Sequence, residues 1–297
     1  MNPPPKPEWV RAKAPSGQTY ARLKELVRQY SLHTVCEEAH CPNVGECWGS
    51  GAATFMIMGE VCTRACRFCN VKSGKPNGVL DREEPSNVAR AAEELALKYV
   101  VITSVDRDDL PDGGASHFAR TITAIRTLAP DTCVEALIPD FGGGFAEIQT
   151  VVEAGPDVIG HNLETTERLT PTVRDPRASY RKSLRVLEQV KELSQRILTK
   201  SSLMLGLGEQ EEDVLQTLRD LREVDTDLLT LGQYLRPSPR NLPVVRYITP
   251  DEFHYYRGVG EQLGFKYVAS GPLVRSSYRA GEYFLNSVIE RIGHWTS

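Results

Sequence analysis

The sequence predicts an α/β fold in which parallel strands alternate with helices, arranged as a barrel or partial barrel. Apolar, strand-like runs recur six times up to residue 232, and segments with helical periodicity separate them. Residues 53–232 are occupied by this alternation, which fits a barrel better than a short open sheet. A doubly wound open sheet remains the alternative.

The elements follow one another in a regular order after a proline-rich start. A helix is predicted over residues 19–32, where apolar side chains recur at helical spacing. The predicted strands cover residues 53–59, 99–105, 132–138, 157–161, 197–205 and 227–232. The predicted helices between them cover residues 85–98, 116–129, 145–154, 179–194 and 210–223. A helix over 250–264 and a strand over 266–270 precede the C-terminal tail.

Composition excludes several classes of partner. The 35 basic and 39 acidic residues give a net charge of −4, which argues against nucleic acid as the main partner. The N-terminal stretch has no apolar core of a signal peptide, and no later run approaches the roughly 20 residues that span a bilayer. We therefore expect a cytoplasmic protein without a membrane partner.

Six of the seven cysteines lie within residues 36–69. In a reducing compartment such a cluster is typical of metal ligands or redox thiols rather than disulfides. The seventh, Cys133, lies in the apolar run "TCVEALIP" and is expected to be a small buried core residue.

The stretch "CTRACRFC" places Cys62, Cys66 and Cys69 at gaps of three and two residues. Structural zinc sites use four closed ligands, and the nearest histidines, His33 and His40, lie by the other cysteines. Three thiolates around an iron–sulfur cube leave one iron open for a substrate or cofactor. A zinc knuckle is the alternative.

This C-x3-C-x2-C spacing, with Phe68 before the last cysteine and a strand before the first, resembles the radical SAM superfamily. The resemblance implies a partial (β/α)6 TIM-like barrel with N- and C-terminal extensions. It also implies that Cys62, Cys66 and Cys69 hold a catalytic [4Fe–4S] cluster. In that family the open iron binds S-adenosylmethionine (SAM) and cleaves it to a 5′-deoxyadenosyl radical.

Further segments resemble the SAM-binding parts of that superfamily. Gly206 and Glu209 in "SLMLGLGE" match a motif that backs the adenine, although Ser202 and Met204 replace two of its residues. Ordinary strand ends and an Asp/Gly-rich loop would explain these segments equally well, and His161 is expected to be a packed core histidine. The other expected SAM contacts are Phe68 in the cysteine stretch and, after the second and fourth strands, Thr103, Ser104, Asn162 and Glu164.

The upstream stretch "CEEAHCPNVGEC" spaces its cysteines at gaps of four and five residues. Together with "CTRACRFC" and the C-terminal "RSSYRAGE", this run is similar to the lipoyl synthase family along essentially the whole chain. The resemblance implies an auxiliary [4Fe–4S] cluster with Ser277 as an unusual fourth ligand, rather than its neighbour Ser276. The three cysteines of that cluster are Cys36, Cys41 and Cys47.

The implied reaction inserts sulfur at carbons 6 and 8 of an octanoyl chain attached to a lysine of a carrier protein. The auxiliary cluster is consumed as the sulfur donor. The implied carriers are the E2 subunits of 2-oxoacid dehydrogenases and the H protein of glycine cleavage. An electron donor such as flavodoxin or ferredoxin and an iron–sulfur carrier for cluster repair are implied as well.

The expected organisation is an N-terminal extension over 1–50, the barrel over 51–272 and a C-terminal extension over 273–297. Residues 1–30 carry six basic and two acidic side chains, a local charge of +4 that would suit an acidic carrier domain or simply a solvated helix face. Two other functions remain open. One is a radical SAM enzyme that inserts sulfur into a free small molecule, and the other is a two-cluster electron-transfer protein.

Overall fold

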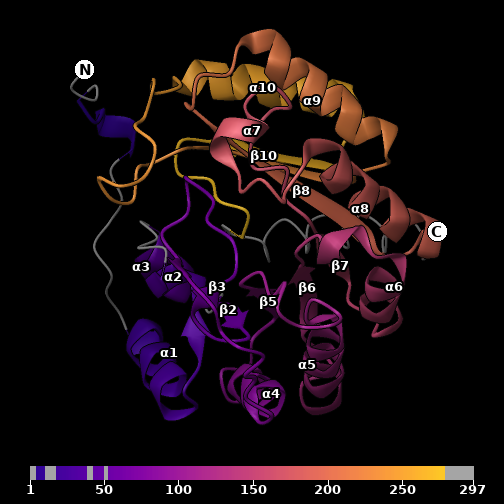
Figure 1. Cartoon of the computed structure of the whole chain (residues 1–297). Helices are drawn as coiled ribbons and strands as arrows, with labels where there is room; N and C mark the ends of the chain where they lie inside the picture. The colour runs from indigo at the N-terminus through magenta and orange to yellow at the C-terminus, as the bar shows by residue number, and fades with distance from the viewer. Residues whose placement is uncertain (1–4, 11–17, 39–42, 50–52, 278–297) are drawn as a thin grey trace, which may run out of the picture.

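The computed structural model describes residues 5–10, 18–38, 43–49 and 53–277. Its main feature is an eight-stranded sheet with the order β1-β2-β5-β6-β7-β8-β9-β10 (Figure 1). Strand β1 (His33–Thr34) pairs antiparallel with β2, and every other neighbouring pair is parallel. The parallel strands are β2 (Ala53–Ile57), β5 (Tyr99–Ser104), β6 (Cys133–Leu137), β7 (Val158–Gly160), β8 (Leu198–Leu205), β9 (Leu228–Gln233) and β10 (Tyr267–Gly271).

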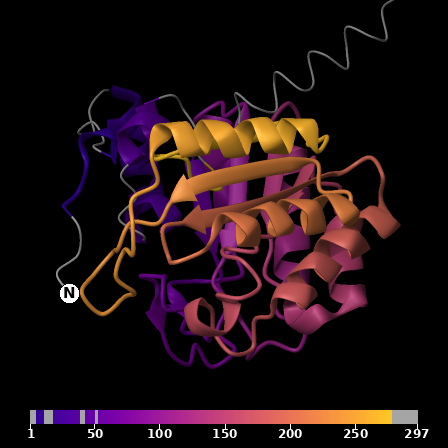
Figure 2. The same cartoon turned by 90° about the horizontal axis from the view of Figure 1, so that it is seen from above.

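Helices surround this sheet on its outer side in Figure 1, and Figure 2 shows α10 running alongside the last strands. The longer helices are α1 (Gln18–Gln29), α4 (Glu84–Glu94), α5 (Ala115–Leu128), α6 (Phe145–Glu153), α8 (Tyr180–Leu193), α9 (Glu211–Glu223) and α10 (Pro250–Gln262). The short elements are α2 (Val35–Glu38), α3 (Val44–Gly49), α7 (Thr170–Val173), the 3-10 turns η1 (Glu8–Val10) and η2 (Phe141–Gly143), and a two-stranded ribbon of β3 (Val61–Cys62) and β4 (Lys72–Ser73). Within these described segments, every helix is too short or too polar to span a lipid bilayer.

The strand order decides between the two predicted architectures. From β2 to β10 the strands are neighbours in the same order as in the sequence. A doubly wound sheet reverses its strand order at a switch point, whereas a barrel winds in one direction. The predicted partial barrel is confirmed, and β10, expected as a strand over 266–270, adds a seventh parallel strand to the six expected up to residue 232.

Local sequence explains where the elements begin and end. Strand β2 ends at Ile57 because Met58 and Gly59 both have positive φ angles, 69° and 85°, which turn the chain out of the sheet. Helices α9 and α10 begin with capping boxes, and Thr249 of the second accepts a hydrogen bond from the backbone N–H of Glu252.

The N-terminal segment shares the core of the barrel. Leu23 and Val27 of α1 and Trp48 of α3 belong to the same buried cluster as Phe55 of β2. Strand β1 extends the sheet beyond β2. The division at residue 50 remains a prediction, although this packing ties the described part of the N-terminal extension firmly to the barrel.

The differences from the predictions lie in short elements. The two-residue strands and the four-residue helices α2 and α7 were missed because segments of that length carry no periodicity. Cys133 is half-buried rather than fully buried, and it packs beside Tyr99 and Val101 at the start of β6. Cys41 and residues 278–297 lie outside the described residues.

Candidate functional site

The cysteine loop, residues 62–69, lies at the carboxyl ends of the parallel strands. Its first residue ends β3, and Thr63 N donates to the carbonyl of Asp106, directly beyond β5, at 3.0 Å. From the other side of the barrel, Asn241 Nδ2 donates to the carbonyl oxygen of Cys69 at 2.8 Å. The loop is therefore held by segments that follow different strands.

Each of the three thiols accepts a hydrogen bond from a backbone N–H. The donors are Arg64 N to Cys62 Sγ at 3.4 Å, Asp175 N to Cys66 Sγ at 3.3 Å and Val71 N to Cys69 Sγ at 3.5 Å. Burial raises the pKa of Cys62 to about 12 and that of Cys66 to about 11. Thiolates in this position require a compensating positive charge, and N–H donors aimed at sulfur are typical of iron–sulfur ligands. The residues thus fit a metal cluster.

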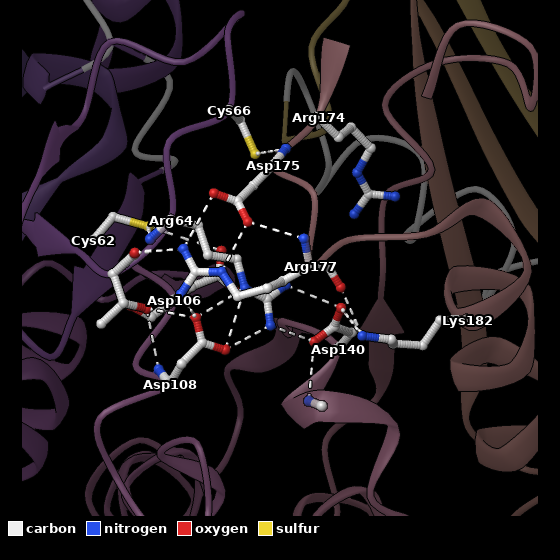
Figure 3. A network of polar contacts seen from close by, with 12 residues as sticks. Cys62, Arg64, Cys66, Asp106, Asp108, Asp140, Arg174, Asp175, Arg177 and Lys182 are labelled. Carbon is white, nitrogen blue, oxygen red and sulfur yellow. Dashed lines mark hydrogen bonds and ion pairs between the residues drawn. The ribbon is translucent and has the colours of Figure 1, made fainter. Parts of the chain in front are cut away.

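Arg64, inside the cysteine loop, is buried among carboxylates (Figure 3). Its guanidinium donates to both oxygens of Asp108 and both oxygens of Asp140, at 2.7–3.2 Å. Asp106 lies 3.3 Å from Nη1. The arginine holds the pKa of Asp140 well below its usual range. This bidentate contact with two carboxylates fixes the loop to the ends of β5 and β6.

A cavity that is partly open to solvent adjoins the cysteine loop. Its walls come from the ends of successive strands and include Cys66, Phe68, Thr103, Ser104, Asn162 and Glu164. Five of these six residues are the SAM contacts expected from the sequence, and the structure brings them together around one space.

The polar groups of this cavity differ in their partners. Thr103 Oγ1 donates to the carbonyl of Leu137 at 2.9 Å, whereas Ser104 Oγ is buried without a hydrogen-bond partner among the described residues. Asn162 Nδ2 donates to Glu164 Oε1 at 3.1 Å. Burial raises the pKa of Glu164, against the opposing effect of Arg174. A buried hydroxyl without a partner and a buried carboxylate with a raised pKa are suited to bind a polar ligand.

Gly206 and Glu209 lie beyond β8 and are not among the residues that line this cavity. The Glu209 carboxylate accepts from the backbone N–H groups of Gly206 at 2.6 Å and Leu207 at 3.0 Å. Gly206 has a φ angle of 102°, and a Cβ there would lie 2.2 Å from the side-chain amide of Gln233. These contacts shape the turn after β8, and the adenine role remains a prediction.

Arg174 also lines the cavity and was not among the residues expected from the sequence. Its Nη1 donates to Ser183 Oγ at 2.8 Å, while its buried Nε has no hydrogen-bond partner among the described residues. No motif marked this arginine, because its position depends on the turn between α7 and α8. His161, expected to be a packed core histidine, contacts the carbonyl of Ile138 and Ser183 Oγ at 2.9 Å each, which confirms that interpretation.

The upstream cysteines are described only in part. Cys36 is buried in α2 and Cys47 is half-buried in α3. The C-terminal segment returns to the same region, since Asn43 Nδ2 donates to the carbonyl of Leu273 at 2.6 Å. Ser276 and Ser277, which follow, are both half-buried.

The returning C-terminal segment passes close to the backbone of β9. A Cβ on Gly232, near the end of β9, would lie 2.0 Å from the carbonyl oxygen of Val274. Only glycine permits the crossing without displacement of the backbone.

Comparisons with known proteins agree with this geometry. Residues 56–221 match the radical SAM superfamily, and residues 4–41 match the N-terminal domain of lipoyl synthase of the radical SAM family. The chain is 57% identical over 282 residues to lipoyl synthase of Thermus thermophilus, covering 95% of this chain and 87% of that one. The chain belongs to the lipoyl synthase family. Lipoyl synthase of Myxococcus xanthus is likewise 57% identical over 286 residues, covering 96% of each chain.

As a member of the lipoyl synthase family, the chain is a radical SAM enzyme that inserts sulfur into a protein-bound octanoyl chain to form the lipoyl group. Its cofactors are SAM and two [4Fe–4S] clusters. The family acts on lipoyl carrier proteins, which excludes the electron-transfer alternative as the function of the chain.

Solved structures of low sequence identity share the fold alone. Methylornithine synthase (PylB) superposes with a TM-score of 0.54 at 14% identity, covering 86% of this chain and 83% of that one. SuiB of Streptococcus suis bound to S-adenosylmethionine superposes with a TM-score of 0.56 at 8% identity, covering 77% and 53%.

Proposed function

We propose that Cys62, Cys66 and Cys69 hold the cluster that binds SAM, and that the adjoining cavity takes the SAM molecule. The observation that carries this assignment is the set of three desolvated thiols, each met by a backbone N–H, beside a cavity with unpaired polar atoms. Bound there, the cluster and SAM supply a radical reactive enough to abstract hydrogen from an unactivated C–H bond. The chain itself supplies placement and exclusion of water.

The polar residues of the cavity have separate proposed contacts. Ser104 donates its unpaired hydroxyl to the methionyl part of SAM, and Arg174 places its unpaired Nε toward a carboxylate. Asn162 and Glu164, which are hydrogen-bonded to each other, exchange hydrogen bonds with the ribose hydroxyls of SAM. Thr103 fixes the cavity wall through its hydrogen bond to the carbonyl of Leu137, and Phe68 forms an apolar part of that wall.

Cys36, Cys41, Cys47 and Ser277 are the proposed ligands of the auxiliary cluster. The hydrogen bond from Asn43 to Leu273 supports the serine, because it brings the segment before Ser277 to the start of α3. The close approach at Gly232 fixes where the same segment passes the end of β9. Serine oxygen is a harder iron ligand than thiolate, so its bond is easier to protonate and release. That property suits a cluster whose sulfur is used up.

We also propose particular proteins as carriers, reductant and repair partner. They are the E2 subunits of 2-oxoacid dehydrogenases and the H protein as carriers, flavodoxin or ferredoxin as reductant, and an iron–sulfur carrier for repair. The basic excess of residues 1–30 supports docking of an acidic domain. Turnover with a carrier domain that did not change with salt concentration would remove this docking role.

The test is anaerobic reconstitution followed by turnover with an octanoyl-lysine peptide. Iron should reach about eight per chain if both sites hold four-iron cubes. The thiolated peptide should form at about one product per chain, because the donor cluster is consumed. Sustained turnover of the purified protein alone would contradict a consumed cluster, and thiolation of free octanoate but not of the peptide would favour the small-molecule alternative.

A further inference from the structure

Residues 172–177, which run from the end of α7 into the turn before α8, lie against the cysteine loop although the two stretches are more than 100 residues apart in the chain. Figure 3 shows Asp175 and Arg177 beside Cys66 and Arg64. The hydrogen bonds between the stretches are Arg67 N to Val173 O at 3.0 Å, Arg67 Nη1 to Thr172 O at 3.1 Å, Asp175 N to Cys66 Sγ at 3.3 Å, Ala65 N to Asp175 Oδ2 at 2.8 Å and Arg177 Nη2 to Thr63 O at 2.7 Å.

Asp175 is the centre of this contact. Its side chain is 6% exposed and accepts hydrogen bonds from Ala65 N and from the backbone and guanidinium of Arg177. Its own backbone N–H points at Cys66 Sγ. Asp175 therefore binds the loop at two adjacent residues. Its carboxylate accepts from Ala65 N, and its backbone N–H donates to Cys66 Sγ.

Arg177 holds the carboxylate in this orientation. Its guanidinium contacts Asp175 through Nε at 2.9 Å and Asp108 through Nη1 at 3.1 Å. Its Nη2 also donates to the carbonyl oxygen of Thr63. A buried carboxylate is stable only when donors satisfy its oxygens, and this arginine supplies most of them.

We propose that Asp175, oriented by Arg177, is a positioning residue that fixes the cysteine loop before any cluster is bound. The proposal rests on the proposed function only in taking Cys66 as a cluster ligand. Loss of the carboxylate leaves Ala65 N without its acceptor and lets the N–H of residue 175 turn away from the Cys66 sulfur. Fewer N–H donors at a ligand sulfur destabilise the reduced cluster and make its reduction potential more negative.

The test is hydrogen–deuterium exchange on the chain without clusters, comparing wild type with Asp175→Ala and Asp175→Asn. The matched control is Asp213→Ala, because the Asp213 carboxylate likewise pairs with an arginine, Arg168 at 2.6 Å, and accepts a backbone N–H, from Gln210 at 2.8 Å. That pair braces the start of α9 instead of the cysteine loop. Exchange in a peptide spanning β8 serves as the internal reference for global stability.

We expect Asp175→Ala to speed exchange across residues 63–69 by about tenfold, the effect of one lost well-placed hydrogen bond. Asp175→Asn, which keeps an oxygen for Ala65 N, should lie between Asp175→Ala and wild type. Asp213→Ala should leave residues 63–69 unchanged. After reconstitution, the midpoint potential of the SAM-binding cluster, followed by electron paramagnetic resonance, should be more negative than wild type in Asp175→Ala, intermediate in Asp175→Asn and unchanged in Asp213→Ala.

Wild-type exchange across residues 63–69 in Asp175→Ala, or equal loosening there in Asp213→Ala, would overturn the proposal. If Asp175→Ala did not fold, wild-type exchange and potential in Asp175→Asn and in Arg177→Gln would overturn it equally. The proposed function fails separately, through a Cys66→Ala variant that still cleaves SAM, and such a result would leave the exchange data standing.

Discussion

On the scale of single residues, Arg64 shows why charge alone does not define this site. Lysine at this position keeps the positive charge but cannot bridge Asp108 and Asp140 with two bidentate contacts. Arg64→Lys should therefore lower the free energy of unfolding of the cluster-free chain by about 2 kcal/mol. Urea unfolding measures this, with Arg181→Lys in an exposed pair as the control, expected to change stability by less than about 0.5 kcal/mol. Equal effects of the two substitutions would refute the geometric role.

The partner carboxylate Asp140 predicts a pH dependence. Its pKa is depressed in the folded chain, since Arg64 stabilises the ionised form against the cost of burial. The stability that Asp140 contributes is thus fully present above the unfolded pKa of about 3.9 and is lost as the pH falls toward the folded value. Below about pH 4, wild type should therefore lose stability more steeply with falling pH than Asp140→Asn. Parallel pH profiles of the two proteins would show that the carboxylate is not coupled to folding.

The serine pair at 276 and 277 gives a further residue-scale prediction. In extended or turn geometry, adjacent side chains point in different directions, so both rarely reach one iron. Ser277→Ala should yield a more labile auxiliary cluster, and Ser277→Cys should keep that cluster but slow sulfur insertion while SAM cleavage persists. Iron content over time and product yield measure these effects. If Ser276→Ala gave the losses and Ser277→Ala did not, the ligand assignment would be wrong by one residue.

On the scale of elements, the end of β9 controls where the C-terminal segment can lie. A Cβ on Gly232 would meet the carbonyl oxygen of Val274 at 2.0 Å, so Gly232→Ala must push that segment away. We expect iron after reconstitution to fall from about eight toward about four per chain, with SAM cleavage retained.

The control for this variant is Gly258→Ala in α10, where a Cβ meets nothing within 4 Å. It should keep full iron content and gain about 0.5–1 kcal/mol of stability, as alanine favours a helix interior over glycine. Full iron content in Gly232→Ala would mean that the crossing is not needed for the auxiliary site.

Element positions also show what sequence can predict here. The strands β5 and β8 and the helices α5 and α9 were placed to within about two residues, because their apolar periodicity is long and uninterrupted. The turn between α7 and α8 was not, since neither Asp175 nor Arg174 belongs to a periodic pattern. Their roles depend on contacts with a loop more than 100 residues away, which no local pattern encodes.

On the scale of the whole molecule, the sequential winding of the barrel gathers residues from every strand end at one edge. That is why motif residues from 66 to 164, far apart in the chain, line one cavity. The SAM-cluster cysteines were predicted from their spacing and the auxiliary cysteines from the family resemblance, and both ligand sets remain predictions. The cavity could not be predicted without the fold. Arg174 and the ion pairs of Arg64 became visible only once the strand ends were brought together.

The two cysteine sets are proposed to have different roles. The cluster of the 62–69 set generates the radical, and the cluster of the 36–47 set supplies the sulfur. The most direct measurement follows 5′-deoxyadenosine and thiolated octanoyl-lysine peptide together in Cys66→Ala and Cys47→Ala after anaerobic reconstitution. Cys66→Ala should form neither product, whereas Cys47→Ala should still form 5′-deoxyadenosine but no thiolated peptide. Equal loss of 5′-deoxyadenosine in both variants, or thiolated peptide from Cys47→Ala, would contradict these roles.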